Sequence, residues 1–223
     1  MTSKIKAVIF DYDGVLNDSL DVIRRLYNEF YELGITNKYF ETNEEVANFF
    51  VGDPHKNLEN AGAKLTPELI KYCDGIVSNF IPREDKKVDF YEGIDKMLLS
   101  LADDGYRLAV VSNGNKTAII NKLRKYGVES VVELVYGYED VPKPKPHPIG
   151  IQKCLKELNL KPEEALYVGD LEDDIGAAKA AGVKMIATNY GYLSYADNAD
   201  ERLKDADILV DTVDELYESI KNA

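Results

Sequence analysis

Short apolar runs alternate along the chain with longer stretches in which apolar residues recur at helical spacing. The first run, 7–10, has four apolar residues in succession, which predicts a strand buried on both faces. The alternation predicts an α/β fold, a Rossmann-like, doubly wound and mostly parallel sheet with helices on both faces. Further strands are expected at 107–111, 131–135, 165–168, 183–187 and 208–210, and helices at 94–101, 116–126, up to 158, at 174–181 and after 212.

Residues from about 18 to 84 contain helical patterns only. The expected helices are one behind the possible N-caps Asp18 and Ser19, one opened by a capping box at Thr42, one ending near Asn60, and one from Leu69 to a stop at Pro82. A helical block that interrupts an α/β pattern suggests a separate domain inserted after the first strand. We therefore expect an α/β core domain of residues 1–17 and 88–223, and a small all-α domain of residues 18–87.

Composition limits the classes of partner. The chain has 223 residues, of which 45% are hydrophobic, enough for one core and a smaller second one. A formal net charge of −13 argues against nucleic acid and anionic membranes as partners, and makes local cations necessary for binding a small phosphate. Cys73 and Cys154 show no metal or disulfide spacing, and the chain contains no apolar signal or membrane-spanning stretch, so we expect a cytoplasmic protein.

Polar residues follow three of the expected strands. Asp11 and Asp13 end the first strand, and Gly14 just beyond them would let a ligand approach the backbone closely. Aspartate and glycine are also ordinary turn residues, but two acids held together need a cation or a shared proton. In a parallel sheet these residues would share one edge with the polar residues that follow two later strands, namely Ser112 and Asn113 after one, and Asp170 and Asp174 after the other.

The segment from Asp11 to Ser19, Asp-Tyr-Asp-Gly-Val-Leu-Asn-Asp-Ser, resembles the first signature of the haloacid dehalogenase-like hydrolase superfamily in its phosphatase form. The resemblance implies that Asp11 is the nucleophile that becomes an aspartyl phosphate, and that Asp13 is the general acid and base. A second carboxylate at position 13 favours phosphoryl transfer over attack on carbon–halogen or carbon–phosphorus bonds. The resemblance also implies that the helical insertion is a cap that covers the active site and selects the substrate.

The same resemblance implies a Mg²⁺ cofactor, a cation that prefers oxygen ligands. The implied ligands are the Asp11 carboxylate, the Asp13 backbone carbonyl, Asp170 and, directly or through water, Asp174. Ser112 resembles the second signature, whose hydroxyl holds phosphoryl oxygens, with Asn113 and Gly14 as further substrate contacts. Glu172 and Asp173 are expected to be solvated or to cap a helix.

A lysine in a Lys-Pro-x-Pro context forms the third signature, and the proline-rich segment 141–148 offers two candidates, Lys143 and Lys145. Resembling phosphatases place this lysine about 25 positions before the metal-binding aspartate. Lys145 lies 170 − 145 = 25 positions before Asp170, so we prefer it to Lys143, which we read as an exposed charge.

In resembling caps a loop often carries a basic side chain into the active site. Lys56 is our candidate here and His55 the second, although Lys56 could instead be a solvated residue in the first turn of a helix. The expected function is a Mg²⁺-dependent phosphatase acting on a small phosphorylated metabolite, as a monomer or homodimer. The alternatives are a phosphomutase of the same family acting on a sugar phosphate and a non-enzymatic phosphate-binding protein.

Overall fold

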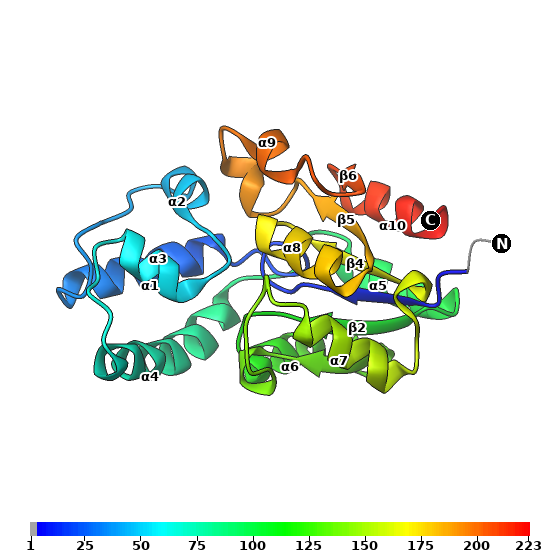
Figure 1. The fold of residues 1–223 in the computed structure, drawn as a ribbon, viewed down its shortest axis with the longest axis horizontal. Helices are drawn as coiled ribbons and strands as arrows, with labels where there is room; N and C mark the ends of the chain where they lie inside the picture. Colours follow the sequence, from blue (N-terminus) through cyan, green and yellow to red (C-terminus); the bar gives the residue numbers. More distant parts are fainter. Residues whose placement is uncertain (1–3) are drawn as a thin grey trace.

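In the computed structural model, which describes residues 4–223, the chain forms one parallel six-stranded sheet with a helical unit beyond one end of it (Figure 1). The strand order is β3-β2-β1-β4-β5-β6, so β1 lies in the middle with β2 and β4 at its sides. The strands are β1 (Ala7–Phe10), β2 (Arg107–Val111), β3 (Val132–Tyr136), β4 (Ala165–Gly169), β5 (Lys184–Thr188) and β6 (Ile208–Val210).

Helices cover both faces of this sheet. Alternate residues of β1 enter different cores: Val8 and Phe10 pack in one apolar cluster, and Ala7 and Ile9 in the other. The first cluster includes side chains of α5 (Ile94–Asp103), α6 (Lys116–Lys125) and α10 (Val213–Lys221), and the second those of α7 (Ile149–Leu158), α8 (Glu172–Ala181) and α9 (Ala199–Leu203). The predicted doubly wound α/β fold is confirmed. Within residues 4–223, no helix combines the length and apolar character needed to span a bilayer.

The remaining helices form the cap and have an apolar core of their own. They are α1 (Leu20–Glu32), α2 (Asn43–Phe49), α3 (Pro54–Asn60) and α4 (Pro67–Glu84), at the left of Figure 1. Buried side chains such as Tyr27, Phe30, Phe40 and Leu58 pack together in this core, which Tyr192 of the sheet domain also joins. A small all-α unit therefore follows β1, as the pattern predicted, while its limits at 18 and 87 stay a prediction.

The two chain segments that join cap and sheet are tied to each other. The Asn17 Nδ2 donates to Asp85 Oδ1 at 2.8 Å, across the two connections. The Nζ of Lys122, on α6, donates to the carbonyl oxygens of Asp85 and Val88 at 2.6 and 2.5 Å. Both connections are thus anchored to the sheet domain at one buried point.

The helix expected to stop at Pro82 continues to Glu84, so this prediction is wrong. Proline removes one backbone donor from a helix, which usually ends or kinks it. Here the last turn is held from outside, because the buried Glu84 carboxylate accepts hydrogen bonds from Arg25 of α1, and from Arg83 and Lys87. Tertiary contacts therefore outweigh the local preference.

Smaller differences concern element ends and short turns. β3 and β5 lie one residue later than predicted, and α8 begins at Glu172 instead of 174. The capping box at Thr42 is confirmed. α9 was not expected, nor were the short 3₁₀ turns η1 (Asp85–Lys87), η2 (Glu129–Val131), η3 (Tyr138–Asp140), η4 (Pro162–Glu164) and η5 (Tyr192–Tyr195).

Candidate active site

The carboxyl edge of the sheet collects the polar residues that follow its central strands. Asp11 comes directly after β1, Ser112 after β2 and Asp170 after β4, and all three are buried. Because these strands are parallel neighbours, their ends meet at one edge, where open α/β sheets bind ligands. The structure thus brings together residues that lie far apart in the sequence.

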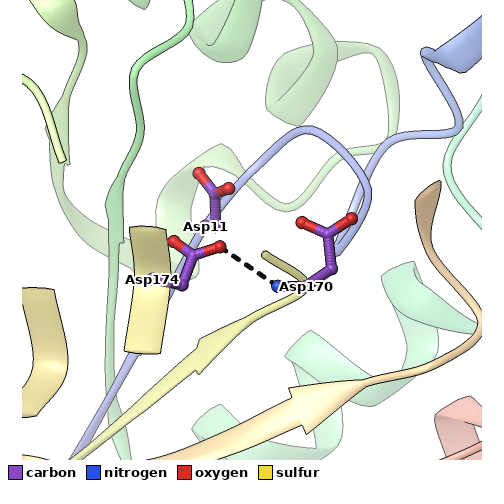
Figure 2. Close-up of side chains that lie close together, drawn as sticks. All are labelled: Asp11, Asp170 and Asp174. Atoms are coloured by element: carbon purple, nitrogen blue, oxygen red, sulfur yellow. Dashed lines mark hydrogen bonds between the residues drawn. The ribbon is translucent and has the colours of Figure 1, made fainter. Parts of the chain in front are cut away.

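Three carboxylates converge at this edge. One oxygen from each of Asp11, Asp170 and Asp174 lies within 4.8 Å of the others, and Figure 2 shows Asp174 approaching from α8. Burial raises the pKa of Asp11 to about 6, although the neighbouring Lys145 cation opposes this. Burial, with Asp174 and Asp11 adding repulsion, also holds the pKa of Asp170 well above its usual range. Carboxylates this close and this buried need a cation or a shared proton among them.

Lys145 supplies one positive charge to this group. Its Nζ lies 2.9 Å from Asp11 Oδ1 and donates to Asp174 Oδ1 at 2.5 Å and to the Tyr167 hydroxyl at 3.1 Å. Burial lowers the pKa of Lys145, but the two carboxylates outweigh it and raise the pKa overall. The side chain is 7% exposed, whereas Lys143 is exposed on the surface. Of the two lysines, the structure therefore places at the site the one that the spacing favoured.

Asp174 is saturated by contacts within the protein. Its Oδ2 accepts hydrogen bonds from the backbone N–H groups of Asp170 and Leu171, each at 3.1 Å, the first of which is the dashed line in Figure 2. Its Oδ1 accepts from Lys145, and the Tyr167 hydroxyl lies 2.9 Å away. Asp174 therefore orients the lysine and the start of α8, a role that its position four residues after Asp170 did not reveal.

Asp13 belongs to a chain of hydroxyl groups. Ser19 Oγ donates to Asp13 Oδ1 at 2.5 Å and lies 2.7 Å from the Tyr192 hydroxyl. Burial raises the pKa of Asp13 to about 7, against the hydrogen bond from Ser19, which lowers it. Ser19 does occupy the N-cap position of α1, but its side chain makes no capping hydrogen bond because it is engaged with Asp13.

Asn113 and Ser112 stabilise the loops around the carboxylates. Asn113 Oδ1 accepts from the Lys145 backbone N–H at 2.9 Å, and its Nδ2 donates to the Gly52 carbonyl of the cap at 3.1 Å. Ser112 Oγ accepts from the Gly114 N–H at 3.0 Å. Asn113, expected as a substrate contact, thus fixes the segment that carries the lysine.

Gly14 is required for close packing against a carboxylate. Its φ of +79° is a conformation that side chains disfavour, and a Cβ there would lie 2.0 Å from Asp170 Oδ2. The sequence suggested that a ligand approaches this backbone, and in the structure the Asp170 side chain does.

A cavity of about 550 Å³ opens above these residues, between the sheet and the cap. His55 is among its lining residues, whereas Lys56 is exposed in the first turn of α3 and is not. Asp173, expected to be solvated or to cap a helix, lies on the cavity wall with its pKa raised to about 6 by burial and by Asp174. Glu172 is exposed and pairs with Arg202.

Residues 8–188 match the model of a protein family that is described as "Haloacid dehalogenase-like hydrolase". The chain belongs to this family. Members from other organisms match over most of their length. The phosphoglycolate phosphatase of Chromobacterium violaceum is 28% identical over 98% of this chain and 97% of its own, and the pyrophosphatase PpaX of Halalkalibacterium halodurans is 28% identical over 84% and 85%.

Solved structures of the family share the fold. The crystal structure of a predicted phosphatase from Clostridium acetobutylicum superimposes with a TM-score of 0.83 at 26% identity, covering 99% of this chain and all of the other. The family and the names of its relatives confirm the expectation of a phosphatase-type hydrolase.

Proposed function

We propose that the protein is a Mg²⁺-dependent phosphatase that hydrolyses a small phosphate monoester through an aspartyl phosphate on Asp11. The observation that carries this proposal is the pairing of Asp11 with Lys145 at the floor of a cavity that Asp13 also lines. A nucleophilic carboxylate, a cation for the phosphoryl oxygens and a second acid are the groups that such a reaction needs.

The acidic cluster fits the proposed cation. Asp170 Oδ1 is buried and has no hydrogen-bond partner among residues 4–223, so one ligand oxygen is free of protein contacts. Asp11, Asp170 and the Asp13 carbonyl would hold the ion, with Asp174 supporting them. When bound, Mg²⁺ would draw charge from the phosphoryl oxygens and so lower the barrier to attack.

The chain's own residues then divide the reaction. An Asp11 oxygen forms a bond to phosphorus while the bond from phosphorus to the leaving oxygen breaks, and protonated Asp13 gives its proton to that oxygen. Asp13, now ionised, takes a proton from water as the water attacks phosphorus and releases Asp11. Its pKa of about 7 suits both directions, since both forms are populated near neutral pH. Lys145 and Ser112 bind the phosphoryl oxygens.

The names of the relatives make phosphoglycolate and pyrophosphate the first substrates to assay with Mg²⁺. The intermediate is tested with Asp13→Asn and 4-nitrophenyl phosphate, whose leaving group needs no proton. This variant should release one equivalent of nitrophenol rapidly and then stall, with one phosphoryl group attached to the protein by mass spectrometry.

Asp11→Asn is the control, because its amide is nearly isosteric but cannot attack phosphorus. It should show neither the burst nor the added mass, and its turnover should fall far more than about tenfold, which is only about 1.4 kcal/mol. Turnover within about tenfold of wild type would contradict the assignment of the nucleophile. Transfer of the phosphoryl group to a sugar instead of release as phosphate would contradict hydrolysis.

A further inference from the structure

The cavity continues past the carboxylates into the cap, where most of the side chains that line it are apolar. α1 contributes Val22, Ile23 and Leu26, and α4 contributes Val77 and Ile81. Ile23, Val77 and Ile81 are only half-buried although they pack against the cap core, so part of their apolar surface remains uncovered beside the cavity. Phe50 adds an aromatic wall, edge-to-face with Tyr192 at 5.8 Å.

Charges along the cavity are mostly negative. Among residues 4–223, Lys145 is the only lysine or arginine that lines it, and this lysine is engaged with Asp11 and Asp174. On the cap side the acidic side chains that line it are Asp53, Asp74 and Asp85. A carboxylate or second phosphate on the leaving group would therefore enter a partly apolar space beside acidic side chains, where His55 is the one basic residue of the described cap that lines the cavity and no lysine or arginine of the cap does.

We infer that the leaving group of the natural substrate is an uncharged, largely apolar alcohol, alkyl or aryl, that packs against α1 and α4. This inference rests on the proposed phosphatase function and narrows its substrate class. A cavity of this volume is in the range that holds drug-sized ligands, well beyond a two-carbon acid. Burial of the alcohol's apolar surface supplies the binding free energy.

The experiment compares esters whose reacting end is the same. Ethyl, butyl and hexyl phosphate are assayed with Mg²⁺, together with the analogue of hexyl phosphate that ends in a carboxylate. kcat/KM should rise about fourfold for each buried methylene. The terminal carboxylate should lower kcat/KM at least about tenfold relative to hexyl phosphate, and phosphoglycolate and pyrophosphate should be poor substrates.

A matched pair of variants tests the location. Val77→Lys places a cation on the cavity wall and should shift the preference toward the carboxylate ester, at the expense of hexyl phosphate. Ser78→Lys adds the same charge one residue along α4 at an exposed position, and should leave the preference as in wild type. Circular dichroism should be used to check that both variants are folded.

The outcomes separate the inference from the function on which it rests. Hydrolysis of the esters with equal or greater kcat/KM for the carboxylate ester would overturn the inference and leave the phosphatase function intact. If Lys56→Ala loses the hydrolysis of the carboxylate ester, Lys56 is the cation that binds the carboxylate, and the inference is overturned as well. Absence of any monoester hydrolysis with Mg²⁺ would contradict the proposed function itself.

Discussion

Replacement of Lys145 by alanine should affect stability and catalysis together, because its ammonium group compensates two buried carboxylates. The Asp11 and Asp174 side chains are 7% and 1% exposed, so water cannot replace the lost partner. Breaking a buried ion pair by removing one member costs about 3–5 kcal/mol. We expect Lys145→Ala to lose about this much of its free energy of unfolding in metal-free buffer at about pH 8.

The loss should depend on pH in a defined direction. The folded-state pKa of Asp11 lies above its ordinary value of 3.8 even with the lysine present, and without it the pKa rises further. A carboxyl group that binds its proton more tightly when folded stabilises the folded state fully below its unfolded pKa, and this stabilisation is lost as pH rises from there through its folded pKa. The variant should therefore be closest to wild type at about pH 5, where Asp11 can take up a proton.

Urea unfolding followed by circular dichroism measures the stability, and steady-state kinetics with Mg²⁺ measures the rate. kcat should fall about 10²–10³-fold, the size of effect seen when one donor to a transition-state oxygen is removed. Lys143→Ala is the matched control, since Lys143 is exposed two residues away. Equal losses in the two variants, or a larger one in Lys143→Ala, would refute the choice of lysine.

Two further expectations concern the carboxylates. Asp170→Asn should raise the melting temperature of the metal-free protein, because repulsion among the carboxylates falls. It should also abolish the rise in melting temperature that Mg²⁺ should give wild type, which corresponds to about 2.7 kcal/mol of stabilisation at a hundredfold excess of Mg²⁺ over Kd. The exposed Asp103→Asn should keep that rise, and a metal-dependent shift retained by Asp170→Asn would exclude Asp170 as a ligand. Asp13→Asn should stabilise the metal-free protein by up to about 4 kcal/mol at about pH 8, because the raised folded pKa of Asp13 makes its ionisation costly there. The gain should shrink toward about pH 5, and a gain that grows on acidification would contradict a raised pKa.

Much of the fold was predictable because it depends on local periodicity. Buried parallel strands are short apolar runs, and cap helices show apolar residues at helical spacing, so both could be read directly. The position of Lys145 followed from its spacing to Asp170 in a resembling family. Pro82 was misread because its helix is continued by contacts from α1, which a local pattern does not contain.

The parts of the site that escaped prediction depend on residues distant in sequence. Tyr167 lies within an apolar run and reads as a core residue, yet its hydroxyl reaches Lys145 and Asp174 at the edge of the sheet. Ser19 and Tyr192 are 173 positions apart and meet only because the cap folds onto the loop after β5. The apolar character of the cavity likewise arises from two helices that pack together, and no single segment carries it.

The separate apolar core of the cap has a consequence for how such enzymes diverge. Side chains of α1 and α4 that line the cavity pack against the cap's own cluster, whereas the residues that we propose to bind the phosphoryl group follow strands of the sheet. Mutations that change the proposed alcohol site thus affect the packing of the cap core, whereas mutations at the carboxylates affect the packing of the sheet domain. The specificity for the leaving group can therefore change during evolution while the proposed catalytic residues stay the same.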